Sequence, residues 1–202
     1  MHLRLAAAAL AVLLLALGAG SVLAATPGTA PGQNKLLCFD GGGGAGGTCT
    51  LNANGAKGTA KLNTSTGGAA GVYYTGYNAS IYDVLLTKVT QLSFTVSGSS
   101  MATDPHFSVP IDTGNDDVTD FWAFVPAGSC NNGQGKVDVI GDSTCTIYRS
   151  DDALASYANW KAFAAALPST AVVSFGDYVF VIADSSNGIW TVGNVTIGKS
   201  GK

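Results

Sequence analysis

The chain has 202 residues, of which 47% are hydrophobic and 11% are charged, and its formal net charge at pH 7 is −3. Its lysines and arginines form no cluster that could neutralise a row of phosphates, which argues against nucleic acid and anionic membrane surfaces as partners. All thirteen acidic residues are aspartates, so the glutamate pair used by many glycoside hydrolases is absent.

The N-terminus has the layout of a secretory signal peptide. In the opening MHLRLAAAALAVLLLALGAGSVLAA, Arg4 precedes an apolar run from Leu5 to Leu17, and small residues follow. The run is shorter than the ~20 apolar residues that a membrane span needs, which favours a cleaved signal over a retained anchor. We predict a signal peptide at residues 1–24, with cleavage after Ala24.

The rest of the chain is expected to be secreted and extracellular. Residues 25–34 are rich in proline and glycine, with nothing to pack, and predict a flexible leader. Residues 35–202 are enough for one domain with its own core and too few for two ordinary ones. No later segment is apolar enough to span a membrane, so no membrane contact is expected after the signal is removed.

All four cysteines, Cys38, Cys49, Cys130 and Cys145, lie in the exported part. An even number in an oxidising compartment predicts two disulfides. Three connectivities are possible, and Cys38–Cys49 with Cys130–Cys145 needs the least rearrangement of the chain. The alternative, a zinc site of four thiolates, usually has cysteines two to four residues apart, whereas the gaps here hold ten and fourteen. The glycine-rich stretch DGGGGAGGTC is expected to be a loop closed by the first pair.

Alternation of apolar and polar residues with period two dominates the following sequence. In residues 91–98, Leu92, Phe94 and Val96 point one way and the residues between them point the other way. This pattern is typical of half-buried strands in an antiparallel sheet, and the turn residues between segments recur at intervals typical of β-sandwiches. The expected strands lie within residues 60–64, 71–77, 91–98, 106–112, 121–126, 136–140, 145–149, 171–175, 177–184 and 189–197.

One helix is expected among the strands, within residues 150–168. Ser150 or Asp151 is a candidate N-cap, the composition is rich in alanine, and Pro168 ends the segment. Helical spacing favours core packing over sugar stacking for Trp160. Four residues share the face that we expect to cover an end of the sandwich: Tyr157, Trp160, Ala164 and Leu167.

The order of these segments is familiar. A tyrosine-rich strand, QLSFTV, PHFSVPIDTG, an aromatic strand, a cysteine-bounded loop, the helix and YVFVIADSSNGIWTVGNVTIG follow one another. This order resembles secreted bacterial β-sandwich proteins of jelly-roll or concanavalin-like architecture, which are similar in shape to carbohydrate-binding modules. The likeness covers about Tyr73 to Gly198. It implies an all-β, antiparallel jelly-roll β-sandwich with one short helix packed on it.

The stretch DTGNDDVTD is the candidate metal site, because binding modules of this architecture often hold a structural calcium ion. Asp112, Asp116, Asp117 and Asp120 offer hard oxygen ligands of the kind that Ca2+ requires. The spacing is not that of a helix-loop-helix calcium loop, because Gly114 stands at the third position and no terminal glutamate follows. The alternative is a solvated turn, since Asp, Asn and Gly are ordinary turn residues.

Catalytic chemistry has little support in the sequence. No D-x-D or D-x-x-D strand motif presents two aspartates as the acid and base of a glycoside hydrolase. The domain has one histidine, His106, and no G-x-S-x-G elbow, so a serine nucleophile lacks its usual partners. We expect His106 to be a surface residue at the start of a strand, and the sequence favours a binding role over an enzymatic one.

Sugar binding without chemistry remains the leading functional hypothesis. Aromatic rings stack on the apolar faces of pyranose rings, and the stretch VYYTGYNASIY has more tyrosine than a core strand needs. The expected partner is an extracellular polysaccharide or cell-envelope polymer, with Ca2+ as the one candidate cofactor. The alternatives are a structural surface or matrix protein that acts through protein contacts, and a hydrolase that uses aspartates. The candidate ligand-binding residues are Tyr73, Tyr74, Tyr77, Tyr82 and Trp122, with Trp190 as a further aromatic candidate.

Overall fold

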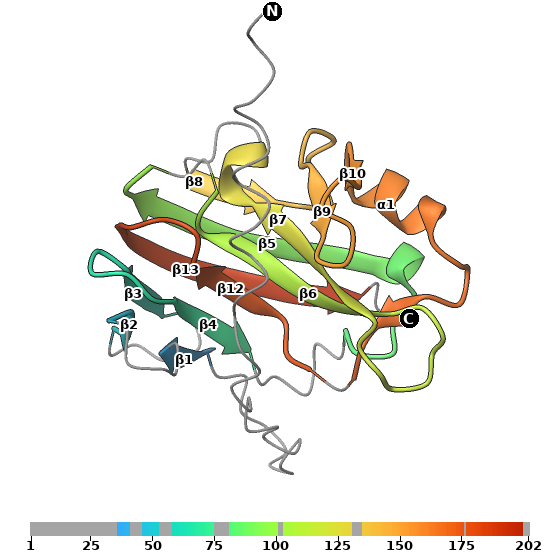
Figure 1. Ribbon diagram of the computed structural model, residues 1–202, viewed down its shortest axis with the longest axis horizontal. Helices are drawn as coiled ribbons and strands as arrows, with labels where there is room; N and C mark the ends of the chain where they lie inside the picture. The colour runs from blue at the N-terminus through green and yellow to red at the C-terminus, as the bar shows by residue number, and fades with distance from the viewer. Residues whose placement is uncertain are drawn as a thin grey trace, which may run out of the picture.

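The alternating segments form the strands of two antiparallel sheets, one of eight strands and one of five, packed as a β-sandwich. Figure 1 looks through the two stacked sheets of the computed structural model. The structure describes residues 36–40, 46–52, 58–74, 81–100, 103–130, 135–175 and 177–199, so the predicted signal peptide and leader lie outside the described residues. The predicted fold class, an all-β sandwich with one short helix, is confirmed.

The eight-stranded sheet has a central strand that is buried along its whole length. In spatial order the strands are β1 (Leu36–Asp40), β4 (Ala70–Tyr74), β12 (Phe180–Ala183), β6 (His106–Asp112), β7 (Phe121–Pro126), β9 (Ile147–Arg149) and β10 (Ser156–Tyr157), with β11 (Val172–Val173) beside the end of β6. All seven residues of β6 are buried. Side chains on both faces of this strand are therefore covered, which is unusual for a two-layer sandwich.

The five-stranded sheet is built around two long strands. Its order is β2 (Thr48–Leu51), β3 (Thr59–Asn63), β13 (Ile189–Lys199), β5 (Val89–Gly98) and β8 (Gly135–Asp138). Strands β13 and β5 pair from Trp190 opposite Gly98 to Lys199 opposite Val89, with an irregularity between Gly193 and Thr196. Gly98 has φ 133°, and an added Cβ would lie 2.3 Å from the carbonyl oxygen of Ile189, so the close approach of the end of β5 to the start of β13 requires glycine here.

The core lies between the inner faces of the two sheets. Phe94 on β5 and Phe107 on β6 meet edge to face across the sandwich, with ring centroids 5.0 Å apart, and both are fully buried. Trp190 on β13 is also buried, with 1% of its surface exposed, and its indole N–H donates to the carbonyl of Ser100. Trp190 is therefore a core residue, and the suggestion that it binds sugar is wrong.

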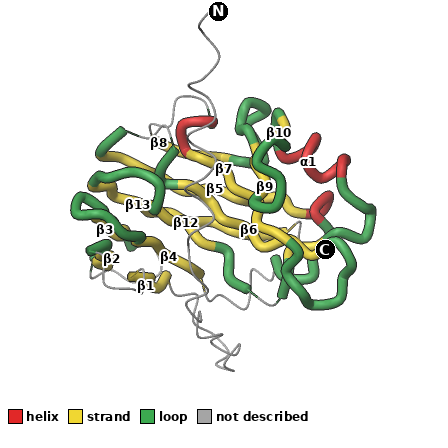
Figure 2. Tube along the Cα trace, viewed as in Figure 1, coloured by secondary structure: helices red, strands yellow, loops and turns green. Residues whose placement is uncertain are grey.

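Helical structure in the described residues is limited to one short α-helix and two 3-10 turns (Figure 2). These are α1 (Trp160–Ala166), η4 (Leu86–Lys88) and η5 (Ala127–Ser129). Trp160 is 4% exposed, and its indole N–H donates to the carbonyl of Leu86 at 3.0 Å, so the expected core packing of Trp160 is confirmed. None of these helices is long and apolar enough to cross a membrane.

The helix begins later than the sequence pattern predicts. Its N-cap is Asn159, whose side-chain oxygen accepts the N–H of Ala162 at 2.9 Å, and neither Ser150 nor Asp151 caps it. Asp151 instead forms an ion pair with Arg149. Residues 152–158, which precede the helix, form a turn and strand β10. Pairing of β10 with β9 satisfies backbone groups that a longer helix would have satisfied internally.

Both predicted disulfides are confirmed, in the predicted connectivity. Cys38 bonds to Cys49 and Cys130 bonds to Cys145. The first bridge joins β1 to β2, and therefore joins the edges of the two sheets. No described cysteine is free, so the four-thiolate zinc site is excluded.

Each of the ten expected strand segments contains a strand. Three further strands, β1, β2 and β10, were not expected from the pattern, because they are short and lie beside glycine-rich or helix-like sequence. Strand β2 pairs with β3 and β10 pairs with β9, both nearby in the chain, whereas β1 pairs with the more distant β4.

Candidate functional site

Strand register places a row of mostly apolar residues on the outer face of the eight-stranded sheet. Residues opposite each other on paired strands share a face, and successive residues alternate between faces. Val72 and Phe107 point into the core, so Tyr73 and Ser108 beside them point outward. The register connects one outward residue from each of six strands in a single row: Leu37, Tyr73, Phe180, Ser108, Phe124 and Tyr148.

Six half-buried aromatic side chains on and beside this row form what we call the aromatic face. Phe180 lies at its centre, with its ring centroid 5.8 Å from Tyr73 and 6.0 Å from Trp122. The Phe39 ring lies 5.6 Å from Phe180, and the Tyr73 and Tyr178 rings are 5.0 Å apart. The members are Phe39, Tyr73, Trp122, Phe124, Tyr178 and Phe180.

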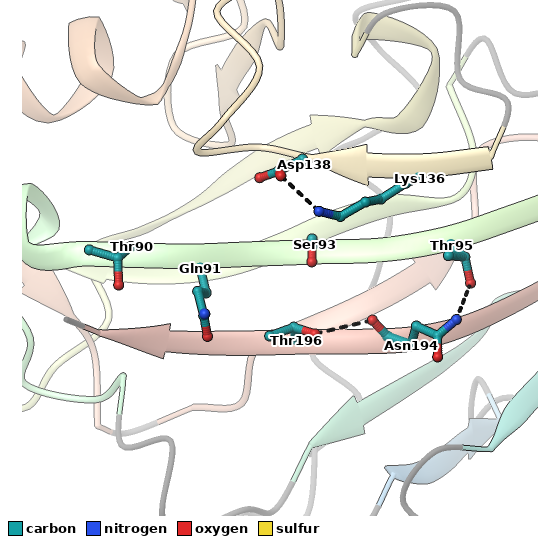
Figure 3. Close-up of a pocket in the computed structure, with 8 residues that line it drawn as sticks. All are labelled: Thr90, Gln91, Ser93, Thr95, Lys136, Asp138, Asn194 and Thr196. Carbon is teal, nitrogen blue, oxygen red and sulfur yellow. Dashed lines mark hydrogen bonds and ion pairs between the residues drawn. The ribbon is translucent and has the colours of Figure 1, made fainter. Parts of the chain in front are cut away.

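The outer face of the five-stranded sheet is of a different kind. It carries a shallow groove of about 510 Å³ whose lining side chains are all polar (Figure 3). Lys136 and Asp138 form an ion pair at 2.9 Å, and Asn194 donates to the hydroxyl of Thr95 at 3.4 Å. Water can form hydrogen bonds with the polar side chains of this groove. The rings of the aromatic face are apolar and form no such bonds with water. The groove is lined by Thr90, Gln91, Ser93, Thr95, Lys136, Asp138, Asn194 and Thr196.

A cluster of one histidine and two aspartates lies at one end of the aromatic face. His106 is the first residue of β6, Asp104 lies two residues before it, and Asp184 follows the last residue of β12. Because Ile182 of β12 pairs with His106, the two segments meet at this point. The Nδ1 atom of His106 lies 3.2 Å from a carboxylate oxygen of Asp104 and 4.0 Å from one of Asp184.

Asp104 is fully buried and is held by many hydrogen bonds. Its carboxylate accepts the backbone N–H and the hydroxyl of Ser186, at 2.6 and 2.7 Å, and both groups of Ser185, at 3.0 and 2.9 Å. Burial raises the pKa of Asp104, but the hydrogen bonds from His106 and the two serines outweigh it and hold the pKa below the ordinary 3.8. Asp104 is therefore ionised, and it fastens the loop after β12.

Asp184 differs from Asp104 in its surroundings. Its side chain is 25% exposed, and among the described residues no hydrogen-bond donor lies on its carboxylate. Burial raises the pKa of Asp184 above the ordinary 3.8; a charged His106 opposes this and Asp104 adds to it. One ligand atom from each of Asp104, His106 and Asp184 lies within 4.8 Å of the others, so the group could hold a metal ion.

His106 is not the surface residue that the sequence suggested. It does begin a strand, as expected, but only 7% of its surface is exposed, and its ring packs edge to face on Phe124 at 5.4 Å. The closeness of Asp104 to His106 could be read from the sequence, because only one residue separates them. Asp184 lies 78 residues after His106 in the chain, and only the pairing of β12 with β6 brings it close.

The acidic loop predicted to bind calcium is organised by its own hydrogen bonds. Asp112 is buried, and its carboxylate accepts the N–H groups of Asn115, Asp116 and Asp117 at 2.5, 2.9 and 2.8 Å. Asp120 accepts the N–H and hydroxyl of Thr113, which hold its pKa below the ordinary value. These hydrogen bonds stabilise a polar turn between β6 and β7. The calcium site formed by Asp112, Asp116, Asp117 and Asp120 stays a prediction.

The predicted sugar-binding aromatics fall in different places. Tyr73 and Trp122 lie on the aromatic face. Tyr82 does not: its ring packs on Phe175 at 6.2 Å, and its hydroxyl accepts the N–H of Val179 at 3.4 Å. The side chain of Tyr74 and the whole of Tyr77 lie outside the described residues.

Four members of the aromatic face were not singled out from the sequence: Phe39, Phe124, Tyr178 and Phe180. A usable signal was present, because the segments FWAFVP and YVFVIA are apolar at nearly every position rather than at alternate ones. A strand in a two-layer sandwich needs only one apolar face, so this composition indicates that the outer face is also covered or has a ligand.

No family model, no curated protein and no solved structure matches this chain. The resemblance to jelly-roll and concanavalin-like proteins is therefore supported at the level of architecture, as two antiparallel sheets packed in a sandwich with one short helix.

Proposed function

We propose that the protein is a secreted, non-catalytic binding module that holds an extracellular polysaccharide on its aromatic face. The observation that carries the proposal is the aromatic face, a group of six half-buried rings on the outer face of the eight-stranded sheet. Contiguous exposed apolar patches on soluble proteins usually mark a binding surface, and aromatic faces suit the apolar sides of pyranose rings.

The extent of the face favours a linear sugar polymer over a single small molecule. The rings of Phe39, Tyr73 and Trp122 surround Phe180, with their centroids 5.6, 5.8 and 6.0 Å from its own, and the four residues come from four different strands. A surface that spans several strands can contact more than one sugar unit of a chain. The hydroxyl groups of Tyr73 and Tyr148 lie in the same row and supply hydrogen-bonding groups for the sugar hydroxyls.

Hydrolysis of the bound polymer is not part of the proposal. The two aspartates that the fold brings together are Asp104 and Asp184. Asp104 is fully buried and accepts hydrogen bonds from two serines, so its carboxylate has no path to a glycosidic oxygen. A pair of carboxylates must both reach the scissile bond for glycoside hydrolysis.

The test is binding of the protein to a panel of insoluble and immobilised polysaccharides, compared with Trp122→Ala and Tyr73→Ala variants. We expect each variant to lose about tenfold or more in affinity, equivalent to about 1.4 kcal/mol, because each loses one stacking ring. Phe175→Ala is the matched control, since Phe175 is an aromatic residue, 44% exposed, that is not part of the aromatic face.

Two results would contradict the proposal. One is polysaccharide binding that both aromatic-face variants retain while their folding is unchanged. The other is the absence of binding to every polysaccharide together with specific capture of an envelope protein, which would support the alternative of a surface protein acting through protein contacts.

A further inference from the structure

The cluster of Asp104, His106 and Asp184 offers the donor atoms of a transition-metal site. One imidazole nitrogen and two carboxylate oxygens form a mixed N/O set, which suits Zn2+ and its neighbours better than Ca2+ or Mg2+. The three residues come from two segments that are fixed relative to each other by the pairing of β6 with β12. The donor set is therefore held by the fold and does not depend on one flexible loop.

The distances suit a common ion. Zinc lies about 2.0–2.2 Å from nitrogen and oxygen ligands, so two of its ligands are at most about 4 Å apart. The Nδ1 atom of His106 is 3.2 Å from Asp104 and 4.0 Å from Asp184, within this limit. All three ligand atoms lie within 4.8 Å of one another. A small movement of Asp184, which is the most exposed of the three residues, would bring all three ligand atoms within bonding distance of one ion.

The charges of the cluster are unbalanced without a cation. Two carboxylates face one imidazole, so the cluster is negative even when His106 is protonated. Asp104 is compensated by N–H and O–H donors from Ser185 and Ser186, but the carboxylate of Asp184 accepts no hydrogen bond from a described residue. The partly exposed carboxylate of Asp184 lies beside the buried carboxylate of Asp104, and a bound cation would offset the repulsion between these two like charges.

The surroundings also resemble the outer shell of a metal site. Four donors occupy one carboxylate oxygen of Asp104, Oδ2, while the other, Oδ1, accepts the backbone N–H of Asp184 at 3.3 Å and lies 3.2 Å from Nδ1 of His106. Hydrogen bonds of this kind fix the orientation of ligating carboxylates. The edge-to-face contact with Phe124 holds the imidazole ring in place.

We propose that Asp104, His106 and Asp184 bind one divalent transition-metal ion of the zinc type, through Nδ1 of His106 and one oxygen of each aspartate. Three protein ligands leave at least one coordination position for water or for a group of a bound ligand. The ion ties the start of β6 to the loop between β12 and β13, at the end of the aromatic face. This site is separate from the predicted calcium loop and does not depend on the proposed polysaccharide binding.

The test uses the untagged chain after treatment with a chelator, with Zn2+ and Co2+ as probes. We expect about one ion per chain by calorimetry, and a thermal midpoint raised by about 5 °C or more at a hundredfold excess over Kd. Asp184→Asn should abolish both effects. It should still fold, because no hydrogen bond from a described residue depends on the Asp184 carboxylate.

The matched control is Asp152→Asn, which makes the same change of charge on an exposed turn. Asp152 accepts the N–H of Leu154 through one oxygen, and asparagine keeps that acceptor. The control should bind Zn2+ as the unmodified chain does. The proposal is overturned if the unmodified chain binds no Zn2+ or Co2+ at millimolar concentration, or if Asp184→Asn, shown to be folded, binds them equally well. Either result would leave the cluster as an ion pair between His106 and Asp104.

Discussion

At the scale of single residues, position in the fold decides what each aromatic side chain does. Tyr73 and Tyr82 lie nine residues apart in the same tyrosine-rich stretch. Tyr73 is on the aromatic face, whereas Tyr82 is enclosed beside Val179 and Phe175. Burial raises the pKa of Tyr82 from 10.0 to about 12, with smaller contributions from Tyr178 and Asp177.

This shift predicts a loss of stability at alkaline pH. The folded-state pKa of Tyr82, about 12, lies above the ordinary 10.0, so folding favours the neutral phenol. The stabilisation is complete below pH 10 and is lost as the pH rises towards 12. As the pH rises from 9 to 11, ionisation of Tyr82 in the unfolded chain should lower the free energy of unfolding by about 1.4 kcal/mol, which urea denaturation at each pH would measure.

The contribution of Tyr82 can be separated from that of the other tyrosines. In the Tyr82→Phe variant the free energy of unfolding should fall by about 1.4 kcal/mol less than in the unmodified protein over the same pH range. Equal pH profiles for Tyr82→Phe and the unmodified protein would show that the phenol is not buried in solution.

At the scale of elements, the helix shows how local signals compete. Alanine-rich sequence starts well before residue 160, yet α1 has only seven residues. The segment before it pairs with β9, and the Asn159 side chain caps the first turn. A short helix depends more on its cap and on packing than on propensity, because helices of this length are not stable alone.

Removal of that cap predicts a measurable loss of stability. Asn159→Ala leaves the N–H of Ala162 without its acceptor, and should lower the free energy of unfolding by about 1 kcal/mol, within about 0.5–2 kcal/mol. Lys161→Ala, an exposed change in the same helix, should stay within about 0.5 kcal/mol of the unmodified protein. Chemical denaturation compares the three proteins. An Asn159→Ala variant as stable as Lys161→Ala would show that the cap contributes nothing.

At the scale of the whole molecule, two disulfides supplement a core of moderate size. The Cys38–Cys49 bridge spans 11 residues and joins the edges of the two sheets, and the Cys130–Cys145 bridge spans 15. Cross-links of this length stabilise mainly by restricting the unfolded chain.

Loss of one bridge should therefore destabilise the protein substantially. The double change of Cys130 and Cys145 to alanine is expected to lower the free energy of unfolding by about 3 kcal/mol, with the fold retained. Guanidinium denaturation with circular dichroism measures the change. The same experiment on Cys38 and Cys49 is the comparison, and a change below about 1 kcal/mol in both variants would argue that the bridges are not formed in the purified protein.

Much of the architecture was predictable from the sequence. Alternation with period two, together with the turn residues between segments, indicated ten strand segments, because most of the strands have one face in the core and the other outside it. The cysteine spacing predicted both bridges, since short loops close with the least rearrangement. Phe121 lies in the core and Trp122 on the outer face, because successive residues of a strand point to opposite faces.

The candidate sites were only partly predictable. Tyr73 and Trp122 both lie on the aromatic face, and their role in binding a ligand stays a prediction, but nothing in the sequence near them identifies Phe180 as the ring between them. Strand order is not encoded locally: β12 lies between β4 and β6, although about 70 residues separate it from β6 in the chain.

The period of the strands, the pairing of the cysteines and the all-β class could be predicted from the amino-acid sequence, because they depend on neighbouring residues or on short loops. Which outward residues share a face, and which distant carboxylate meets His106, depends on how the strands assemble into sheets. Both follow from strand order and register, and a shift of one residue in the pairing of β12 with β6 would have turned Phe180 inward and carried Asp184 away from the histidine.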